Sequence, residues 1–211
     1  ITPMSRQAEA SRNDRALLQA ARDVLAVDGA HASVASIAAR AGVGIGSLYR
    51  RWRSKTELFQ HLVDVALDEW AEVAEQGLAH DDPWEGLAHY VNHAVNIGSL
   101  APIAGIVTIS EEMAAKNAKS DKAFEALVAR AQEAGVLRPD VTSVDVSLLI
   151  EQLGKSPLIE QLQQQGRTDL LEPARNAVRR LVAIALDGLR TGGRPLPGTP
   201  PSSDLFTERW S

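Results

Sequence analysis

Apolar residues recur at the spacing of an α-helix along almost the whole chain, and this periodicity limits the possible folds more than any other feature. In 13–28, for example, Leu17, Ala21 and Leu25 fall on one face of a helix. No stretch shows the alternation of apolar and polar residues that marks a half-buried strand. Helices are predicted over about 13–28, 34–41, 45–52, 54–76, 83–98, from 102 onward, 119–134, 143–165 and 172–190, ahead of a Gly-, Pro- and Ser-rich tail over 192–211. We therefore predict an all-α fold of about nine helices.

Charge is unevenly divided along the chain. Its 211 residues carry 22 basic and 27 acidic side chains, a net charge of −5. Residues 1–56 hold nine basic and four acidic side chains, a charge of +5, whereas 57–211 hold 13 and 23, a charge of −10. A basic segment joined to an acidic remainder indicates a nucleic-acid-facing part attached to a part with another role.

The composition also excludes several classes of protein. Because it has no cysteine, the chain cannot form a disulfide scaffold, an iron–sulfur cluster, a cysteine zinc site or a thiol nucleophile. It has no apolar run of about 18 residues, so no membrane partner is expected. Residues 1–15 are polar and lack the apolar stretch of a signal peptide, and a cytoplasmic location is expected.

The segment 33–58 predicts a helix-turn-helix. Two short helices are separated by 41–44, where Gly42 and Gly44 permit a sharp crossing and Val43 is expected to plug the turn. Ile37 and Leu48 are expected to hold the two helices together. The exposed face of the second helix then presents hydroxyl and arginine side chains, which suit phosphates and base edges. Candidate DNA-binding residues are Ser33, Gly44, Ile45, Gly46, Ser47, Tyr49, Arg50, Arg51 and Lys55.

The helix that follows is expected to add a second anion site. Ser54 and Glu57 have the spacing of a capping box, a reciprocal pair that fixes a helix start. Lys55 lies in the first turn, where the backbone amides of a helix N-terminus attract phosphate. A helix-turn-helix shape also occurs in proteins that never touch DNA, so a purely structural role stays the alternative for this segment.

The spacing of these residues resembles the tetracycline-repressor (TetR) family. The match is carried by Ser33-Val34, Ile37-Ala38-x-x-Ala41-Gly42-Val43, Gly46-x-Leu48-Tyr49 and Trp52-x-x-Lys55-x-x-Leu58. The resemblance implies a homodimeric, ligand-responsive transcription factor, most often a repressor. It also implies that Tyr49 and Lys55 contact backbone phosphates, while Ile45, Gly46, Ser47, Arg50 and Arg51 lie near the major groove.

The sequence departs from that family at two positions. Arg51-Trp52 stands where the family commonly has His-Phe, and Ile45 cannot read a base edge by hydrogen bonding. Base recognition is therefore expected to depend on Arg50 and on contacts with methyl groups.

The last two long helices are expected to form a dimer face. In 172–190 the apolar residues repeat at intervals of 3, 4 and 7, as in paired helices. Two helices from each subunit would then build a four-helix interface, which the resemblance also implies. The alternative is that these apolar stripes only close the core of one subunit. Candidate interface residues are Leu148, Leu153, Val178, Leu181, Val182, Ala185 and Leu189.

The fifth to seventh helices are expected to enclose a pocket for a small, largely apolar effector. Ligand pockets are mostly apolar with a few polar anchors. Candidate lining residues are Trp70, Trp84, His89, Tyr90, His93, Asn96, Thr108, Met113 and Phe124. For each of them, ordinary core packing or surface exposure is an equally open interpretation.

Sites for catalysis, cofactors and metals are not predicted. His89 and His93 are four residues apart on one helix, but Tyr90 stands where a hydrolytic zinc motif has glutamate. Gly154-Lys155-Ser156 imitates the end of a phosphate-binding loop, but the glycine required five positions earlier is Leu149. An enzyme is therefore not expected.

The predicted organisation is a DNA-binding head over 1–54, a ligand-binding and dimerising body over 55–191 and a tail over 192–211 whose order is left open. The function predicted is repression of transcription through double-stranded operator DNA, relieved when an effector shifts the fourth helix and changes the separation of two heads. Two alternatives stay open: a sensor that acts through a protein partner, and a helical-bundle metalloenzyme that uses His89 and His93.

Overall fold

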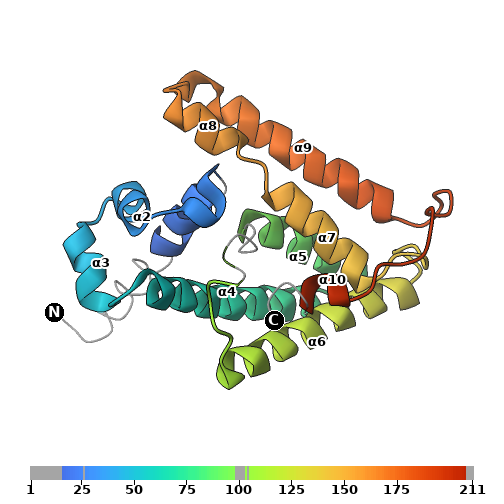
Figure 1. Ribbon diagram of the computed structural model, residues 1–211. Coiled ribbons are helices and arrows are strands. Elements are labelled where there is room, and N and C mark those ends of the chain that lie inside the picture. Colours follow the sequence, from blue (N-terminus) through green and yellow to red (C-terminus); the bar gives the residue numbers. More distant parts are fainter. Residues whose placement is uncertain (1–15, 26, 98–102, 104, 208–211) are drawn as a thin grey trace.

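The computed structural model describes residues 16–25, 27–97, 103 and 105–207 (Figure 1). A first helix covers 16–25 and 27–28 and leads into a short 3-10 turn, η1 (Gly29–His31). The following elements are α2 (Val34–Ala41), α3 (Ile45–Arg51), α4 (Lys55–Leu78), α5 (Pro83–Ile97), α6 (Glu111–Glu133), α7 (Ser143–Gly154), α8 (Leu158–Gln164), η3 (Thr168–Leu170), α9 (Leu171–Leu189) and α10 (Asp204–Thr207). The described residues contain helices and turns without a strand, which confirms the all-α prediction.

Two predicted helix boundaries are wrong. The single helix expected over 143–165 is divided into α7 and α8, because Pro157 cannot continue the hydrogen bonding of α7. The separate helix expected from 102 is not found over 105–109, which form a turn. Instead α6 begins at Glu111, where the Ser110 hydroxyl accepts a hydrogen bond from the Met113 amide at 3.2 Å. The predicted helix starts at 13 and 102 and the end of the tail, 208–211, lie outside the described residues.

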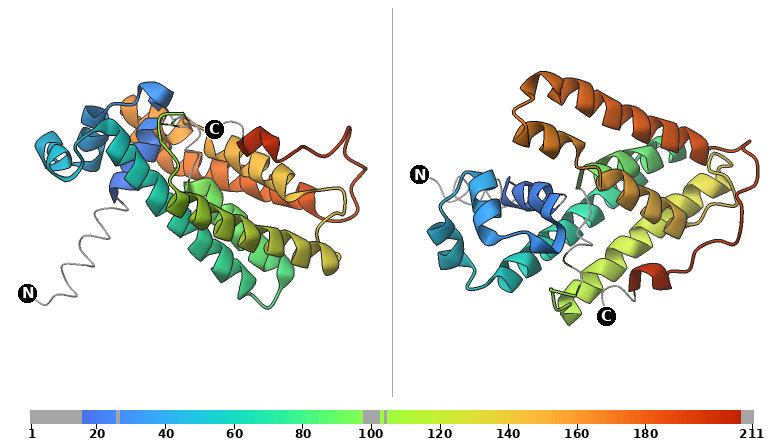
Figure 2. Two further views of the ribbon diagram at one scale, coloured as in Figure 1. Left: turned by 60° about the horizontal axis from the view of Figure 1, so that its bottom comes forward. Right: turned by 45° about the horizontal axis from the view of Figure 1, so that its top comes forward.

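The long helix α4 connects the two parts of the molecule. It runs out of the head and along α5 and α6, while α8 and α9 lie side by side on the other side of the body (Figures 1 and 2). The first half of α4 buries Leu58, Phe59 and Leu62 in one apolar core with the head helices. Its second half joins a separate core made with α5, α6, α7 and α9. One helix thus takes part in both cores and joins the head to the body.

The tail beyond α9 is tied to the body. The Arg138 guanidinium donates to the Asp140 carboxylate at 2.6 Å and to the Arg194 carbonyl oxygen, and the Leu196 amide donates to Asp140 at 2.8 Å. These hydrogen bonds hold the pKa of Asp140 far below its usual range. The Arg190 guanidinium also lies 4.1 Å from the centre of the Trp84 ring. The described part of the tail is therefore held against the body, an outcome that the sequence left open.

Candidate nucleic-acid interface

The helix-turn-helix is built by local capping. Ser33 caps α2, since its hydroxyl accepts from the Ser36 amide at 3.0 Å. Gly42 ends α2 with φ of 68°, a left-handed conformation that favours glycine, and the Val43 amide donates back to the Ala38 carbonyl at 3.0 Å. The chain then turns into α3. The expectation that Val43 plugs this turn is wrong, because the Val43 side chain is exposed.

Two buried anchors decide which face of α3 is exposed. Leu48 packs against α2 and Trp52 closes the end of α3, and both join the core of the head. The opposite face holds the candidates for DNA contact, all of which are exposed: Gly44, Ile45, Gly46, Ser47, Tyr49, Arg50 and Arg51. Tyr49 is 49% exposed, which is high for an aromatic side chain. The Arg51 guanidinium lies 4.5 Å from the centre of the Trp52 ring, so Trp52 also orients Arg51.

The start of α4 lies beside this face. The Ser54 hydroxyl accepts from the Glu57 amide at 3.1 Å, as predicted, but the Glu57 carboxylate accepts from the Arg53 amide at 2.6 Å instead of completing the box at Ser54. Lys55 lies in the first turn with its ammonium 5.2 Å from the centre of the Phe59 ring. The positive charge of Lys55 and the positive end of the helix dipole therefore lie at the same place.

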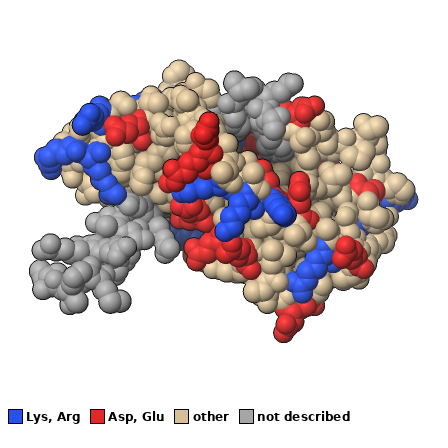
Figure 3. Space-filling view, turned by 90° about the horizontal axis from the view of Figure 1, so that it is seen from below, with Lys and Arg blue, Asp and Glu red and all other residues tan. Residues whose placement is uncertain are grey.

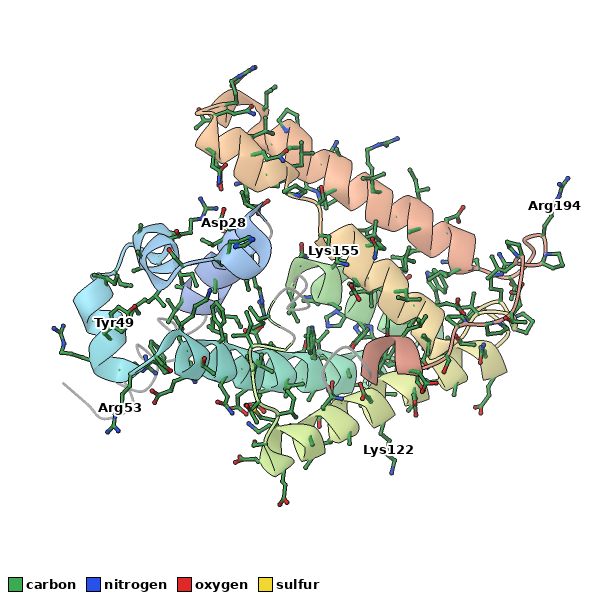
Figure 4. The ribbon with its side chains drawn as sticks, viewed as in Figure 1. Asp28, Tyr49, Arg53, Lys122, Lys155 and Arg194 are labelled. Atoms are coloured by element: carbon green, nitrogen blue, oxygen red, sulfur yellow. The ribbon has the colours of Figure 1, made fainter. Side chains whose placement is uncertain are left out.

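Arg53 is a surface residue that the sequence interpretation missed. It is exposed in the connector between α3 and α4, and it lies with Tyr49 at the outer end of the head (Figure 4). The basic run that contains Arg50 and Arg51 could have indicated Arg53 as a further exposed basic residue. Figure 3 shows Lys and Arg side chains gathered at that end, whereas over the middle of the same view Asp and Glu side chains lie among further Lys and Arg side chains. The head is thus the end of the molecule that a polyanion would approach.

The structure does not bring the nine candidate effector residues around one cavity. Trp84, Tyr90, Met113 and Phe124 are buried in the two cores, and the Tyr90 and Phe124 rings stack with centres 4.7 Å apart. Trp70 is partly buried against both cores. His93, Asn96 and Thr108 are exposed, and His89 is half-buried. The buried aromatic side chains therefore take part in core packing, the interpretation that the sequence left open beside a pocket.

A cavity of about 640 Å³ lies elsewhere, where the head meets the body. Its wall combines the first helix and Arg40 of α2 with the end of α5, the α7–α8 junction and α9. Among the nine candidates only Asn96 lines it. A site made by elements this distant in sequence could not be found from helical periodicity.

The predicted dimer residues of α9 divide between two faces of that helix, and the other two lie on α7. Val182 and Leu189 are buried in the core of the body. Val178 and Ala185 are half-buried, as are Leu148 and Leu153 of α7. By contrast Leu181 is 54% exposed and Ile184, which the sequence interpretation missed, is 64% exposed. Ile184 could have been recognised from its position three residues after Leu181, because that spacing places both side chains on one outward face of α9.

Three histidines lie together on the α4–α5 hairpin. The ring centres of His80 and His89 are 5.2 Å apart, and those of His89 and His93 are 4.1 Å apart. Within the described residues, no group of three His, Cys, Asp or Glu side chains is arranged to hold a metal ion. Partial burial and the two neighbouring imidazoles lower the pKa of His89.

This lowered pKa makes stability depend on pH. Above the unfolded value of about 6.5, His89 is neutral in both states. As the pH falls, the unfolded chain takes up the proton more readily than the folded chain, so folding stability is lost. We expect His89→Gln to reduce the fall in melting temperature between pH 7.5 and 5.5. The exposed His31→Gln serves as the control, and equal falls in His89→Gln and the original protein would contradict the prediction.

A basic helix-turn-helix head on an acidic helical body defines a DNA-binding regulator. The family model described as bacterial regulatory proteins of the tetR family matches residues 17–62, and the model described as the C-terminal domain of SbtR-like transcriptional regulators matches residues 82–191. The chain belongs to the TetR family. Proteins of this family are DNA-binding regulators of transcription and not enzymes.

Solved structures share the fold. A TetR transcription regulatory protein from Mycobacterium vanbaalenii is 25% identical, with a TM-score of 0.52, over 88% of this chain and 99% of its own. A TetR regulator from Streptomyces coelicolor is 24% identical, with a TM-score of 0.51, over 85% and 99%. The regulator LfrR from Mycobacterium smegmatis, solved in complex with proflavine, is 23% identical, with a TM-score of 0.51, over 88% and 99%. No curated protein matches the chain.

Among the described residues, no helix combines the length and apolar character needed to cross a bilayer.

Proposed function

We propose that this protein is a homodimeric repressor that binds operator DNA through its head and leaves it when a small-molecule effector binds the body. The head is assigned to residues 1–54, the body to 55–191 and the tail to 192–211. The observation that carries the proposal is the exposed face of α3, which Leu48 and Trp52 hold outward beside the N-terminus of α4. A recognition helix in the major groove needs such a face.

Each candidate residue has a role in this proposal. Tyr49 and Lys55 contact backbone phosphates, while Ile45, Gly46, Ser47, Arg50 and Arg51 lie near base edges. Gly44 allows close approach of the backbone, and Ser33 fixes the start of α2 by its cap. The two heads of a dimer enter successive major grooves whose centres are about 34–36 Å apart. An effector that changes this separation therefore lowers operator affinity, and operator binding lowers effector affinity by the same factor.

The test is the salt dependence of binding to an operator selected from a random duplex library. We expect Lys55→Ala to weaken binding about tenfold and to reduce the salt slope by about 2, because a dimer loses two phosphate contacts. Tyr49→Phe removes a hydrogen bond but no charge, so it should weaken binding and leave the slope unchanged. Fluorescence anisotropy from 50 to 300 mM salt, roughly the range in which phosphate contacts are felt, measures both effects.

The matched control is Lys122→Ala, which removes an exposed lysine from α6 on the body (Figure 4). It should bind the operator as the original protein does. If the library yields no preferred duplex, or if Lys55→Ala and Lys122→Ala behave alike, the head does not bind DNA as proposed. Recovery of a protein partner through the exposed face of α3 would then support the sensor alternative.

A further inference from the structure

The cavity between head and body has an aliphatic side. Leu25, Val95, Leu153, Ile159 and Val178 line it from five different helices. No aromatic ring is among the lining residues that the structure describes. A site of this kind suits a flexible hydrocarbon chain, whereas a flat polycyclic ligand would have no ring to stack against.

The basic side chains of the cavity are already neutralised. Each of them lies in an ion pair with a carboxylate, at distances of 2.5 to 3.4 Å. These pairs are Arg22–Glu69, Arg40–Asp23, Lys155–Glu151 and Arg175–Glu172. An anionic ligand would therefore have to break an existing pair to find a counter-charge.

Two acidic side chains line the cavity, Asp23 and Glu160. Asp23 pairs with Arg40, whereas Glu160 is in no ion pair among the described residues. Its Oε2 atom is buried and has no hydrogen-bond partner among the described residues. Partial burial raises the pKa of Glu160, and the nearby Asp23 raises it further, while its own backbone N–H and Arg40 oppose these effects. A buried carboxylate oxygen without a donor is unfavourable, so this position favours a bound cation or N–H donor.

Arg22 also lines the cavity and has a second buried polar atom without a hydrogen-bond partner among the described residues. Its side chain is 7% exposed and pairs with Glu69 through Nη2, but its Nε has no partner among the described residues. An Nε–H group can donate to a hydroxyl or carbonyl oxygen. Among the described residues, the side chains that line the cavity thus include a buried acceptor without a partner, at Glu160, and a buried donor without a partner, at Arg22.

We propose that this cavity binds a small aliphatic amine, with its ammonium group beside the Glu160 carboxylate and its hydrocarbon chain on Leu25, Leu153 and Ile159. Because Glu160 is only partly buried and has three side-chain torsions, its carboxylate can turn toward the bound cation. A hydroxyl or carbonyl oxygen on the ligand would accept the Arg22 Nε–H.

The position of the site connects the amine to regulation. Arg40 of α2 donates to Asp23 of the first helix and to Gln163 of α8, so head and body already meet beside the cavity. A ligand that contacts the first helix and the α7–α8 junction together changes the energy of this head position. This step rests on the proposed function, because it takes the amine as the effector.

The test compares n-hexylamine with hexanoate, two ligands with the same chain length and opposite charge. Isothermal titration calorimetry at pH 7.5 should give at least tenfold tighter binding of the amine. Glu160→Gln should remove this preference, and Glu160→Lys should reverse it in favour of hexanoate. Glu112→Gln, which removes an exposed carboxylate from α6, should bind hexylamine as the original protein does. Circular dichroism checks that each variant is folded.

Equal binding of amine and carboxylate, or unchanged amine binding in folded Glu160→Gln and Glu160→Lys, would overturn the proposal. The same preparations are then titrated with operator DNA in the absence of amine. Glu112→Gln should keep the operator affinity of the original protein. If the protein binds operator but does not prefer the amine, only the proposed amine site is wrong. If it binds the amine but no DNA, the proposed function is wrong.

Discussion

Replacing both Leu181 and Ile184 with glutamate is expected to convert the protein into a monomer and to lower its affinity for a two-half-site operator by at least about 100-fold. These are the most exposed large apolar side chains of α9, at 54% and 64%. In the proposed dimer they are buried against a second α9. Four carboxylates placed there would lose their hydration without gaining a positive partner, which costs several kcal/mol.

The effect on DNA binding follows from bivalency. When one head of a dimer is bound, the other is held near its half-site at a high effective concentration, and this can increase overall affinity by about 10²–10⁴. A monomer loses that gain although its head is unchanged. Light scattering after size-exclusion chromatography measures the mass, and fluorescence anisotropy measures affinity for duplexes with one or two half-sites. The monomer should bind both duplexes with nearly equal strength per half-site.

The control is Leu205→Glu, which places the same charge at a side chain of α10 that is 51% exposed. It should stay dimeric, since α10 lies outside the proposed interface. If the Leu181, Ile184 double variant remains a dimer, α9 is not the dimer face.

The helix-turn-helix could be predicted because its signals are local. A cap at Ser33, a glycine at the end of α2 and buried positions at Ile37 and Leu48 all act within about one or two turns, and the structure has each of them. The face of α3 follows directly, since the burial of Leu48 fixes which side chains point outward. The contact between Arg51 and Trp52 also lies within adjacent residues.

The cavity between head and body could not be predicted because it depends on how distant helices pack. Leu25 and Ile159 line the same cavity although 134 residues separate them in the sequence. Aromatic residues such as Tyr90 and Phe124 are typical of ligand pockets and of cores alike, and here they stack in a core. The exposure of Ile184 likewise depends on which face of α9 packs against the body.

Gly86→Ala is expected to destabilise the protein by about 3 kcal/mol, which lowers the melting temperature by roughly 6–12 °C in a chain of this size. Gly86 is buried near the start of α5, where it faces Gly77 near the end of α4. A Cβ atom at Gly77 would lie 2.7 Å from the Gly86 carbonyl oxygen, and a Cβ atom at Gly86 would be closer still to the Gly77 carbonyl oxygen. Both obstacles are backbone atoms of packed helices, so neither can rotate away, and the α4–α5 hairpin must open.

Gly188→Ala is the matched control, because Gly188 lies within α9 and a Cβ atom there meets open space. It should stabilise the chain slightly, by about 0.5–1 kcal/mol, through the better helix propensity of alanine. Since α4 also enters the core of the head, opening the hairpin in Gly86→Ala should weaken operator binding even below the melting temperature. Calorimetric melting and anisotropy with the selected operator test the two effects. A Gly86→Ala protein as stable as Gly188→Ala would show that α4 and α5 do not approach as closely as the glycine pair indicates.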